Sequence, residues 1–273
     1  NNPGSVLSEA IYNKDTGSKF PIFLLTVATN NYAKYLNYRA TTSLVLNNGA
    51  VRDDAGNNAV LTLPALANAN ALMQKKDLWI DGVLPTKLRV GAVVTTGSAT
   101  DTLVAGYWNA TNTGLNVVVP LETTDESLIG GTIQLQAQAI GAGVTGIWTN
   151  LGAAATMSTT TVGLGTQTVP VPNSGANPFE DINNLSQQNP NDVVTIRAIV
   201  IDKAGNSETY NVSNTTINFD QTYPSTSASY KPSRARSTLT IDGVDDATYG
   251  IYWNEAHVGI NITIPFNTDP TLE

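Results

Sequence analysis

Residues 193–206 have the sequence VVTIRAIVIDKAGN, and this stretch decides the fold class of the chain. Its first nine residues are dominated by β-branched and aliphatic side chains, as is typical of a strand. Asp202, Gly205 and Asn206 then supply the residue types that a tight turn with positive φ requires. The stretch therefore predicts a long strand that enters a hairpin turn.

The turn sequence occurs twice in the chain. Asp53-Asp54-Ala55-Gly56-Asn57 matches residues 202–206, and a spacer of the form Asp-x-x-x-Pro follows each turn, at 81–85 and at 220–224. A second pair of matching stretches, 107–120 and 252–265, begins with Tyr-Trp-Asn, contains Gly-Leu-Asn or Gly-Ile-Asn and ends in Pro, at a constant offset of 145 residues. The chain therefore contains an internal repeat.

A repeat separation of roughly 140 to 150 residues approximates one whole domain, which predicts an array of similar domains. Residues 1–84 are then the second half of one unit, 85–223 a complete unit, and 224–273 the first part of the next. On this interpretation we expect the chain to be a segment of a longer protein.

Alternation with period two predicts the individual strands. In the complete unit, strands are expected at 115–119, 132–137, 193–201 and 215–219. In the first segment they are expected at 43–46 and 60–63, next to turns at 48–49 and 54–57. Residues 141–192 are expected to hold the middle strands and a long surface excursion around four prolines, Pro170, Pro172, Pro178 and Pro190. The best helical candidate, 65–72, is short, so the prediction is an all-β chain of Greek-key β-sandwiches.

Composition excludes several function classes. The net charge is −8, which argues against nucleic acid as a partner because such binding depends on Lys and Arg. The absence of cysteine excludes disulfides, thiolate metal sites and cysteine nucleophiles. We find no signal peptide, lipidation signal or membrane span in the sequence.

The first segment resembles the second half of bacterial immunoglobulin-like repeats of very long surface proteins and adhesins. The resemblance rests on five stretches: Leu36-Asn37-Tyr38, residues 44–49 (LVLNNG), the turn 53–57, Leu61-Thr62-Leu63-Pro64 and Ile80-Asp81-Gly82. It covers residues 12–85 well and the complete unit only through its Ala-Gly-Asn turn and its Asp-x-x-x-Pro exit. It implies tandem immunoglobulin-like sandwiches, an extracellular or cell-surface location, and a non-catalytic stalk or adhesion role with neighbouring repeats as partners.

Acidic residues form the main candidate site. In an immunoglobulin-like sandwich, the loop between the second and third strands and the last hairpin turn lie where the chain enters the domain. In the complete unit these elements and the incoming linker contain five acidic residues: Glu122, Asp125, Glu126, Asp202 and Asp81. Converging carboxylate and carbonyl oxygens are what Ca²⁺ requires, and the resembled repeats often use calcium in this way. The alternative interpretation is that these residues only bond backbone amides or are solvated.

A second acidic pair is expected at the opposite end of the unit, where Asp101 would lie near Asp220, with Asp246 the equivalent of Asp101 in the third segment. The single histidine, His257, aligns with Asn112 of the complete unit, so we expect it to be an ordinary surface residue. No zinc spacing, phosphate loop or nucleophile elbow occurs.

Three aromatic residues support an alternative function. Trp108 and Tyr107, with repeat equivalents at 253 and 252, are either core anchors or sugar-stacking platforms. If they or Trp148 are exposed, the chain would be a carbohydrate-binding region of a secreted polysaccharide-processing enzyme. Catalysis by a hydrolase would require two carboxylates about 5 to 10 Å apart in a cleft, and nothing in the sequence singles out such a pair. A glycan or a host-cell ligand is thus an expected partner.

The two incomplete units at the ends of the chain are expected to complement each other. Each would leave unpaired edges and half of an apolar face. We expect residues 236–270 to complete the sandwich begun by residues 5–84, within one chain or by strand exchange between chains. The alternatives are that the partial units stay partial or that the first segment forms a smaller sheet of its own.

Overall fold

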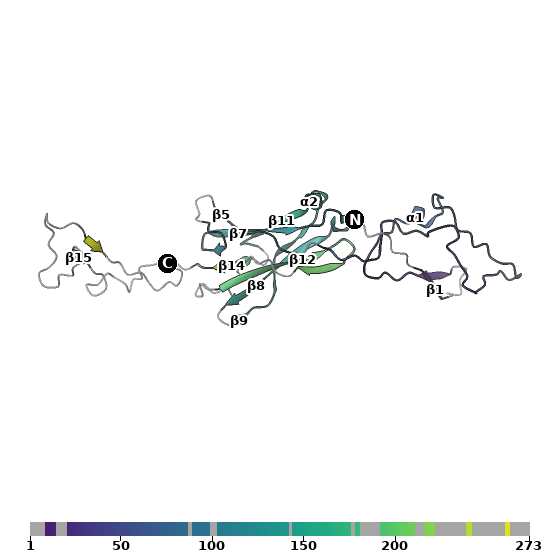
Figure 1. Ribbon diagram of the computed structural model, residues 1–273, viewed down its shortest axis with the longest axis horizontal. Helices are drawn as coiled ribbons and strands as arrows, with labels where there is room; N and C mark the ends of the chain where they lie inside the picture. Colours follow the sequence, from purple (N-terminus) through teal and green to yellow (C-terminus); the bar gives the residue numbers. More distant parts are fainter. Residues whose placement is uncertain are drawn as a thin grey trace.

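The computed structural model describes residues 9–14, 21–86, 89–98, 103–141, 144–175, 178–180, 192–210, 216–221, 239–241 and 260–262. Figure 1 shows the sandwich-like central region at the middle of the long axis, with strand β1 and strand β15 toward opposite ends. The described residues are mostly β-strands in several antiparallel sheets with few helices, so the all-β prediction is confirmed.

The first segment contains two small sheets. Strand β1 (Ile11–Lys14) pairs with β2 (Ile22–Leu24), and β3 (Tyr32–Ala33) pairs with β4 (Ile80–Asp81), both antiparallel. One helical turn, α1 (Leu72–Lys75), precedes β4.

The central region has two sheets. The larger sheet has the order β10-β8-β12-β14-β6, with β13 also paired to β12 and β9 to β8. The smaller sheet has the order β11-β7-β5. The larger sheet is formed by β6 (Tyr107–Trp108), β8 (Thr132–Gly141), β9 (Val144–Thr145), β10 (Thr149–Thr156), β12 (Asp192–Ile201), β13 (Ser207–Tyr210) and β14 (Thr216–Phe219), and the smaller by β5 (Val93–Gly97), β7 (Asn112–Pro120) and β11 (Thr166–Pro172). The short helices η1 (Glu126–Leu128) and α2 (Thr159–Leu164) lie on the connections β7–β8 and β10–β11.

A single apolar core joins the two sheets. Alternate residues of β7 and of β12 are buried, as the period-two pattern predicts. The buried residues of these strands are Leu115, Val117 and Val119, and Val194, Ile196, Ala198 and Val200, and they pack in one cluster with Trp108, Phe179 and Phe219. Each fully buried side chain of this size stabilises the fold by about 1.5 to 3 kcal/mol.

The turn between β12 and β13 has the geometry that its sequence predicts. Both carboxylate oxygens of Asp202 accept hydrogen bonds from Asn206, from its backbone N–H at 2.9 Å and from its Nδ2 at 2.8 Å. Gly205 takes a φ of +93°, which favours glycine. The matching turn in the first segment repeats these bonds, because Asp53 accepts from the backbone N–H and Nδ2 of Asn57, both at 2.8 Å, and Gly56 has a φ of +88°.

Several elements differ from the sequence prediction. The expected strands at 43–46 and 60–63 are not strands, although Asn47 and Asn48 form the predicted turn at positive φ. A single bridge, Arg52 to Asn58, pairs the chain around the Asp53 turn. Without a neighbouring ladder, these apolar runs have no strand to pair with among the described residues.

Two prolines and one helix also differ from the sequence prediction. Pro170 and Pro172 belong to strand β11, not to a surface excursion. Strand β11 lies at the edge of its sheet, where a residue without an N–H is tolerated. Helix α1 begins at Leu72, so the expected helix over 65–72 is wrong.

The last described strands form an antiparallel pair that can be compared with β5 and β7 of the central region. Strand β15 (Leu239–Ile241) pairs with β16 (Ile260–Ile262), and Thr240 lies opposite Asn261. In the central region Val94 of β5 lies opposite Asn116 of β7. At the repeat offset of 145, Asn261 corresponds to Asn116 but Thr240 corresponds to Thr95, so the two antiparallel strand pairs differ in register by one residue.

Candidate functional site at the start of the central region

The linker before the central region is fixed against the first segment. Gly82 forms two backbone hydrogen bonds of 2.8 Å, one from its N–H to the carbonyl of Asn31 and one from the N–H of Asn30 to its carbonyl. A Cβ at Gly82 would lie 2.4 Å from the carbonyl oxygen of Ala28, so only glycine fits this crossing. The side chain of Asp81 is held locally, because its Oδ1 accepts from the N–H of Val83 at 3.0 Å.

The turn of the central region binds this linker. Nδ2 of Asn206 lies 3.1 Å from the backbone carbonyl oxygen of Asp81 and donates to it. The same nitrogen donates to Asp202, which is 4% exposed. One amide group therefore joins the hairpin turn to the incoming chain.

Asp125 of the loop between β7 and β8 is influenced by two other predicted carboxylates, Asp81 and Asp202. The pKa of Asp125 is raised above its usual value, first because the carboxyl is partly buried, and further because the negative charges of Asp81 and Asp202 lie nearby. Hydrogen bonds from the N–H of Ser127 at 3.0 Å and from its Oγ at 2.5 Å partly offset this increase. The charges of Asp81 and Asp202 thus act on the carboxyl of Asp125.

Of the other two predicted acids, Glu126 contacts the first segment and Glu122 is bonded within its own loop. Burial is the first cause that raises the pKa of Tyr32 in β3, and the charge of Glu126 is the second. The carboxylate of Glu126 forms an ion pair of 2.5 Å with Nζ of Lys34 from the first segment. Glu122 is engaged locally, since its Oε1 accepts from Oγ1 of Thr124 at 3.1 Å.

One carboxylate oxygen at the junction has no protein partner. Oδ2 of Asp81 is buried and accepts no hydrogen bond from any described residue. A buried acceptor without a partner is costly, and a cation or an ordered water relieves that cost. Within the described residues, however, no three acidic or histidine side chains are arranged closely enough to form a ready metal centre.

The first segment contributes groups that sequence reasoning missed. Nζ of Lys34 lies 5.1 Å from the ring centroid of Trp79, and Tyr35 contacts the same ring edge-on at a centroid distance of 6.4 Å. Lys34 therefore bridges an aromatic pair and Glu126. No local pattern identifies this lysine, because its partner is 92 residues away.

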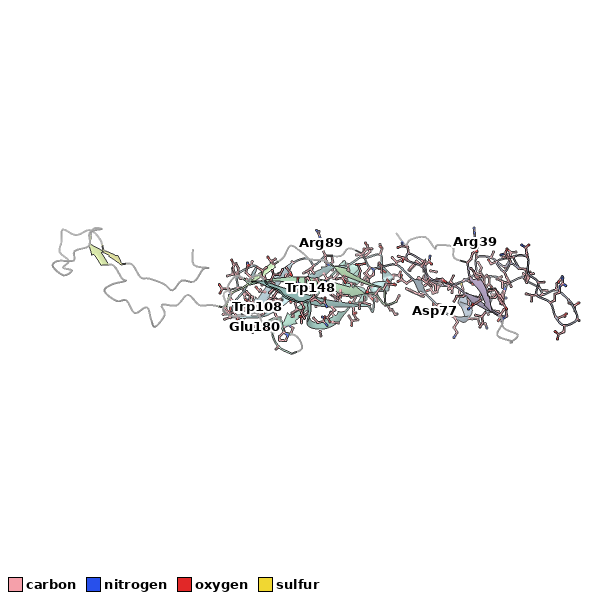
Figure 2. All side chains as sticks on the ribbon, turned by 90° about the horizontal axis from the view of Figure 1, so that it is seen from below. Arg39, Asp77, Arg89, Trp108, Trp148 and Glu180 are labelled. Atoms are coloured by element: carbon pink, nitrogen blue, oxygen red, sulfur yellow. The ribbon has the colours of Figure 1, made fainter. Side chains whose placement is uncertain are left out.

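The opposite end of the central region has a different polar arrangement. Asp101, Asp246, His257 and Trp253 lie outside the described residues, so the predicted second acidic pair is not described. The backbone N–H of Asp220 donates to the carbonyl of Trp108 at 2.9 Å. Glu180 accepts from Nε1 of Trp108 at 3.1 Å and from Nε2 of Gln221 at 2.5 Å. Figure 2 shows Trp108 and Glu180 together at this end.

The exposure of the aromatic residues separates them into two groups. Trp108 is fully buried against Phe179, with ring centroids 4.6 Å apart, so it is a core residue and presents no platform to a ligand. Trp148, labelled in Figure 2, is partly exposed, and the guanidinium of Arg197 lies 4.2 Å from its ring centroid. Arg197 is oriented by Oε1 of Gln136 at 2.8 Å.

In the described part of the chain, no helix is long and apolar enough to cross a membrane. Comparison with known proteins found no matching family model, no matching curated protein and no matching solved structure.

Proposed function

We propose that this chain is a non-catalytic stalk or adhesion segment of a bacterial cell-surface or secreted protein, built from tandem immunoglobulin-like domains. The observation that carries the proposal is the hydrogen bond from Asn206 to the carbonyl of Asp81, because it fixes the entry of the chain to the hairpin turn of the domain that follows. A junction fixed in this way transmits orientation and force from one domain to the next.

The strand pairing of the central region supports the immunoglobulin-like assignment. Strand β12 lies between β8 on one side and β13 with β14 on the other, in a sheet opposite β11-β7-β5. The short strand β6 crosses to the larger sheet and pairs in parallel with β14. The core sits between the two sheets, as in a sandwich.

The matched turns support tandem repetition. The turns at Asp53 and Asp202 share the same hydrogen bonds and the same positive φ at the fourth residue. Strand β16 contains the residues that correspond to 115–117 of β7 at the repeat offset and, like β7, pairs antiparallel with a strand that precedes it in sequence. These matches support the proposal that three parts of the chain carry pieces of one structural unit.

We further propose that Ca²⁺ binds at the junction and stiffens it. Asp81, Asp125 and Asp202 would supply carboxylate oxygens, and Glu122 and Glu126 lie on the same loop as Asp125. The buried, unpaired Oδ2 of Asp81 favours an added cation, and so do the burial and the nearby negative charges that raise the pKa of Asp125. Oxygen ligands of this type suit Ca²⁺.

Thermal unfolding and calorimetric titration test the cation. Added millimolar Ca²⁺ should raise the unfolding midpoint relative to excess EDTA, because a ligand of the folded state stabilises it by mass action. The double variant D81N/D125N should lose both the shift and the binding heat. The matched control D53N changes an acid in the equivalent turn away from this junction and should keep them. A shift that survives D81N/D125N would place any cation elsewhere.

Small-angle scattering tests the stalk independently of calcium. A fixed junction predicts a narrow distribution of maximum dimensions, which N206A should broaden. If wild-type scattering already requires freely rotating domains, the stalk proposal fails even where Ca²⁺ binds.

A second function, carbohydrate binding, is favoured by one observation. The ring of Trp148 is held by Arg197, and Arg197 is connected through Gln136 to Asn150 by a hydrogen bond of 2.9 Å. Aromatic rings beside fixed amide groups suit sugar stacking and hydroxyl binding. A glycan array should then give signals that W148A abolishes and that the buried-core variant W108F retains. Signals that persist in W148A would reject this surface.

A further inference from the structure

The first segment exposes an unusual amount of apolar surface. Val51 lies two residues before its turn and is 53% exposed, whereas the equivalent Val200 of the central region is 1% exposed. The exposed large apolar residues of this segment include Ile11, Phe23, Leu24, Val45, Val60 and Trp79. A partner that covers these side chains would remove their apolar surface from water, which favours association.

The internal repeat identifies what covers the equivalent face in the central region. There, the face that contains Val200 packs in one core with Leu115 and Val117 of strand β7. Strand β7 belongs to the opening strands of the unit, and it pairs with β5. The cover is therefore a pair of strands that precedes the Asp202 turn in sequence.

Strands β15 and β16 form a comparable antiparallel pair, whose register differs by one residue from that of β5 and β7 at the repeat offset. Ile260 and Ile262 of β16 occupy the positions of Leu115 and Val117, at the repeat offset of 145. Among the described strands, β15 and β16 pair only with each other. Within the described part of the chain, these two opening strands therefore have no second sheet packed against them.

The two turns give a second, independent match. Nδ2 of Asn206 donates both within its turn and to the carbonyl of Asp81 in the linker. Nδ2 of Asn57 makes the corresponding bond within its own turn, to Asp53 at 2.8 Å. The linker equivalent to Asp81 is Asp220, which precedes β15 in the sequence as Asp81 precedes β5.

Charge also favours this combination. Residues 1–84 contain seven Lys and Arg and six Asp and Glu residues, a net charge of +1, whereas residues 239–262 contain four acidic residues and no Lys or Arg. Opposite charge promotes the correct encounter of two surfaces.

We propose that the exposed apolar residues around Val51, which include Val45 and Val60 and are called the acceptor face below, bind the strand pair β15–β16 of a second copy of this chain. In this complex the side-chain amide of Asn57 donates to the linker at Asp220 of that copy. The complex rebuilds between two chains the arrangement that Asp81, β5, β7 and the Asp202 turn have within the central region. In Figure 1, β15 and β1 lie toward opposite ends of the molecule, which favours association between chains. Because the two surfaces differ, the contact is heterologous and extends head to tail.

Sedimentation velocity and light scattering on the full chain test the proposal. The weight-average mass should rise with concentration to at least twice that of the monomer. V51D removes the acceptor face, and I260D/I262D removes the donor strand, so each should stay monomeric. The control N261D changes the residue between the two isoleucines, equivalent to the partly exposed Asn116, and should still associate.

A mixing experiment separates this contact from general aggregation. V51D retains the donor pair and I260D/I262D retains the acceptor face, so an equimolar mixture should form a dimer and grow no further. Unchanged tryptophan fluorescence and urea unfolding of the central region would show that each variant folds. A monomeric wild-type chain, a mixture that stays monomeric, or a mixture that grows beyond the dimer would each overturn the proposal.

Discussion

The side-chain amide of Asn206 donates a 3.1 Å hydrogen bond to the backbone carbonyl of Asp81, 125 residues earlier in the chain. A backbone acceptor is available whatever side chain occupies the linker, so this contact depends on the position of the turn. The turn is in place because Asp202 accepts two bonds from Asn206 and Gly205 permits the positive φ. A short sequence motif therefore serves as both a hairpin turn and a domain junction.

Replacing Asn206 should loosen the junction more than it destabilises the hairpin. N206A removes one hydrogen bond within the turn and one to the linker, at a cost of about 1 to 2 kcal/mol. The matched variant N57A removes the same bond within its own turn but none to the Asp81 linker. Urea unfolding measures the free energies, and residual dipolar couplings measure the relative domain order. Equal loss of order in both variants would contradict a special role for Asn206.

Glycine at position 131 should be required for the approach of the loop after η1 to the Asp202 turn. A Cβ there would lie 2.3 Å from the carbonyl oxygen of Ile201 and 2.8 Å from Cα of Asp202. Both contacts are to backbone atoms that cannot move alone. G131A should therefore cost about 1 to 3 kcal/mol in the free energy of unfolding.

The control for this variant lies in helix α2. Gly163 is exposed, and a Cβ there would meet nothing within 4 Å. G163A should therefore stabilise the protein by about 0.5 to 1 kcal/mol, since alanine is the better helix former. If G131A unfolds at the same urea concentration as wild type, the backbone at Gly131 does not pack closely against the backbone of Ile201 and Asp202.

Ionisation of Asp125 should destabilise the fold in the absence of a cation. Its folded-state pKa is raised by burial and by the charges of Asp81 and Asp202. The folded state therefore binds this proton more tightly than the unfolded state does. The stability contributed by this group is complete below the unfolded pKa near 3.8 and is lost as the pH rises through the folded value.

The variant D125N isolates this effect. Asparagine keeps an oxygen that accepts from Ser127 but carries no charge. In EDTA at neutral pH, D125N should be more stable than wild type by up to about 1 kcal/mol, and the difference should vanish near pH 3. Asp53 has a lowered pKa because the side chain and backbone of Asn57 donate to it. D53N should therefore show the opposite sign, and the same sign in both variants would reject this assignment.

The sequence was most informative where one short motif determines its own structure. The turn at Asp202 and the strands over 115–119, 132–137, 193–201 and 215–219 are found within one or a few residues of the predicted ends. Their period and turn residues are local signals. The runs 43–46 and 60–63 have the same composition and are not strands, because a strand also needs a neighbour to pair with.

The candidate site shows the same division. The prediction that Asp81, Asp125 and Asp202 lie near one another came from the expected positions of a linker, a loop and a turn, and in the structure burial and then the charges of Asp81 and Asp202 raise the pKa of Asp125. The pairing of Lys34 with Glu126 had no local signal, because it depends on how two segments dock. The buried, unpaired Oδ2 of Asp81 is likewise a product of packing.

The acceptor on Glu180 should be essential for the packing of Trp108. The indole N–H is buried with its ring and donates to Oε1 of Glu180 at 3.1 Å, and Gln221 donates to the same oxygen. E180A leaves the buried indole donor without an acceptor, which should cost about 1 to 3 kcal/mol. E180Q keeps an oxygen at this position and should lose less than half as much. The double variant E180A/W108F removes donor and acceptor together, so a double-mutant cycle in urea should give a coupling of about 1 kcal/mol. Additive single-variant losses would mean that this hydrogen bond does not hold the tryptophan in place.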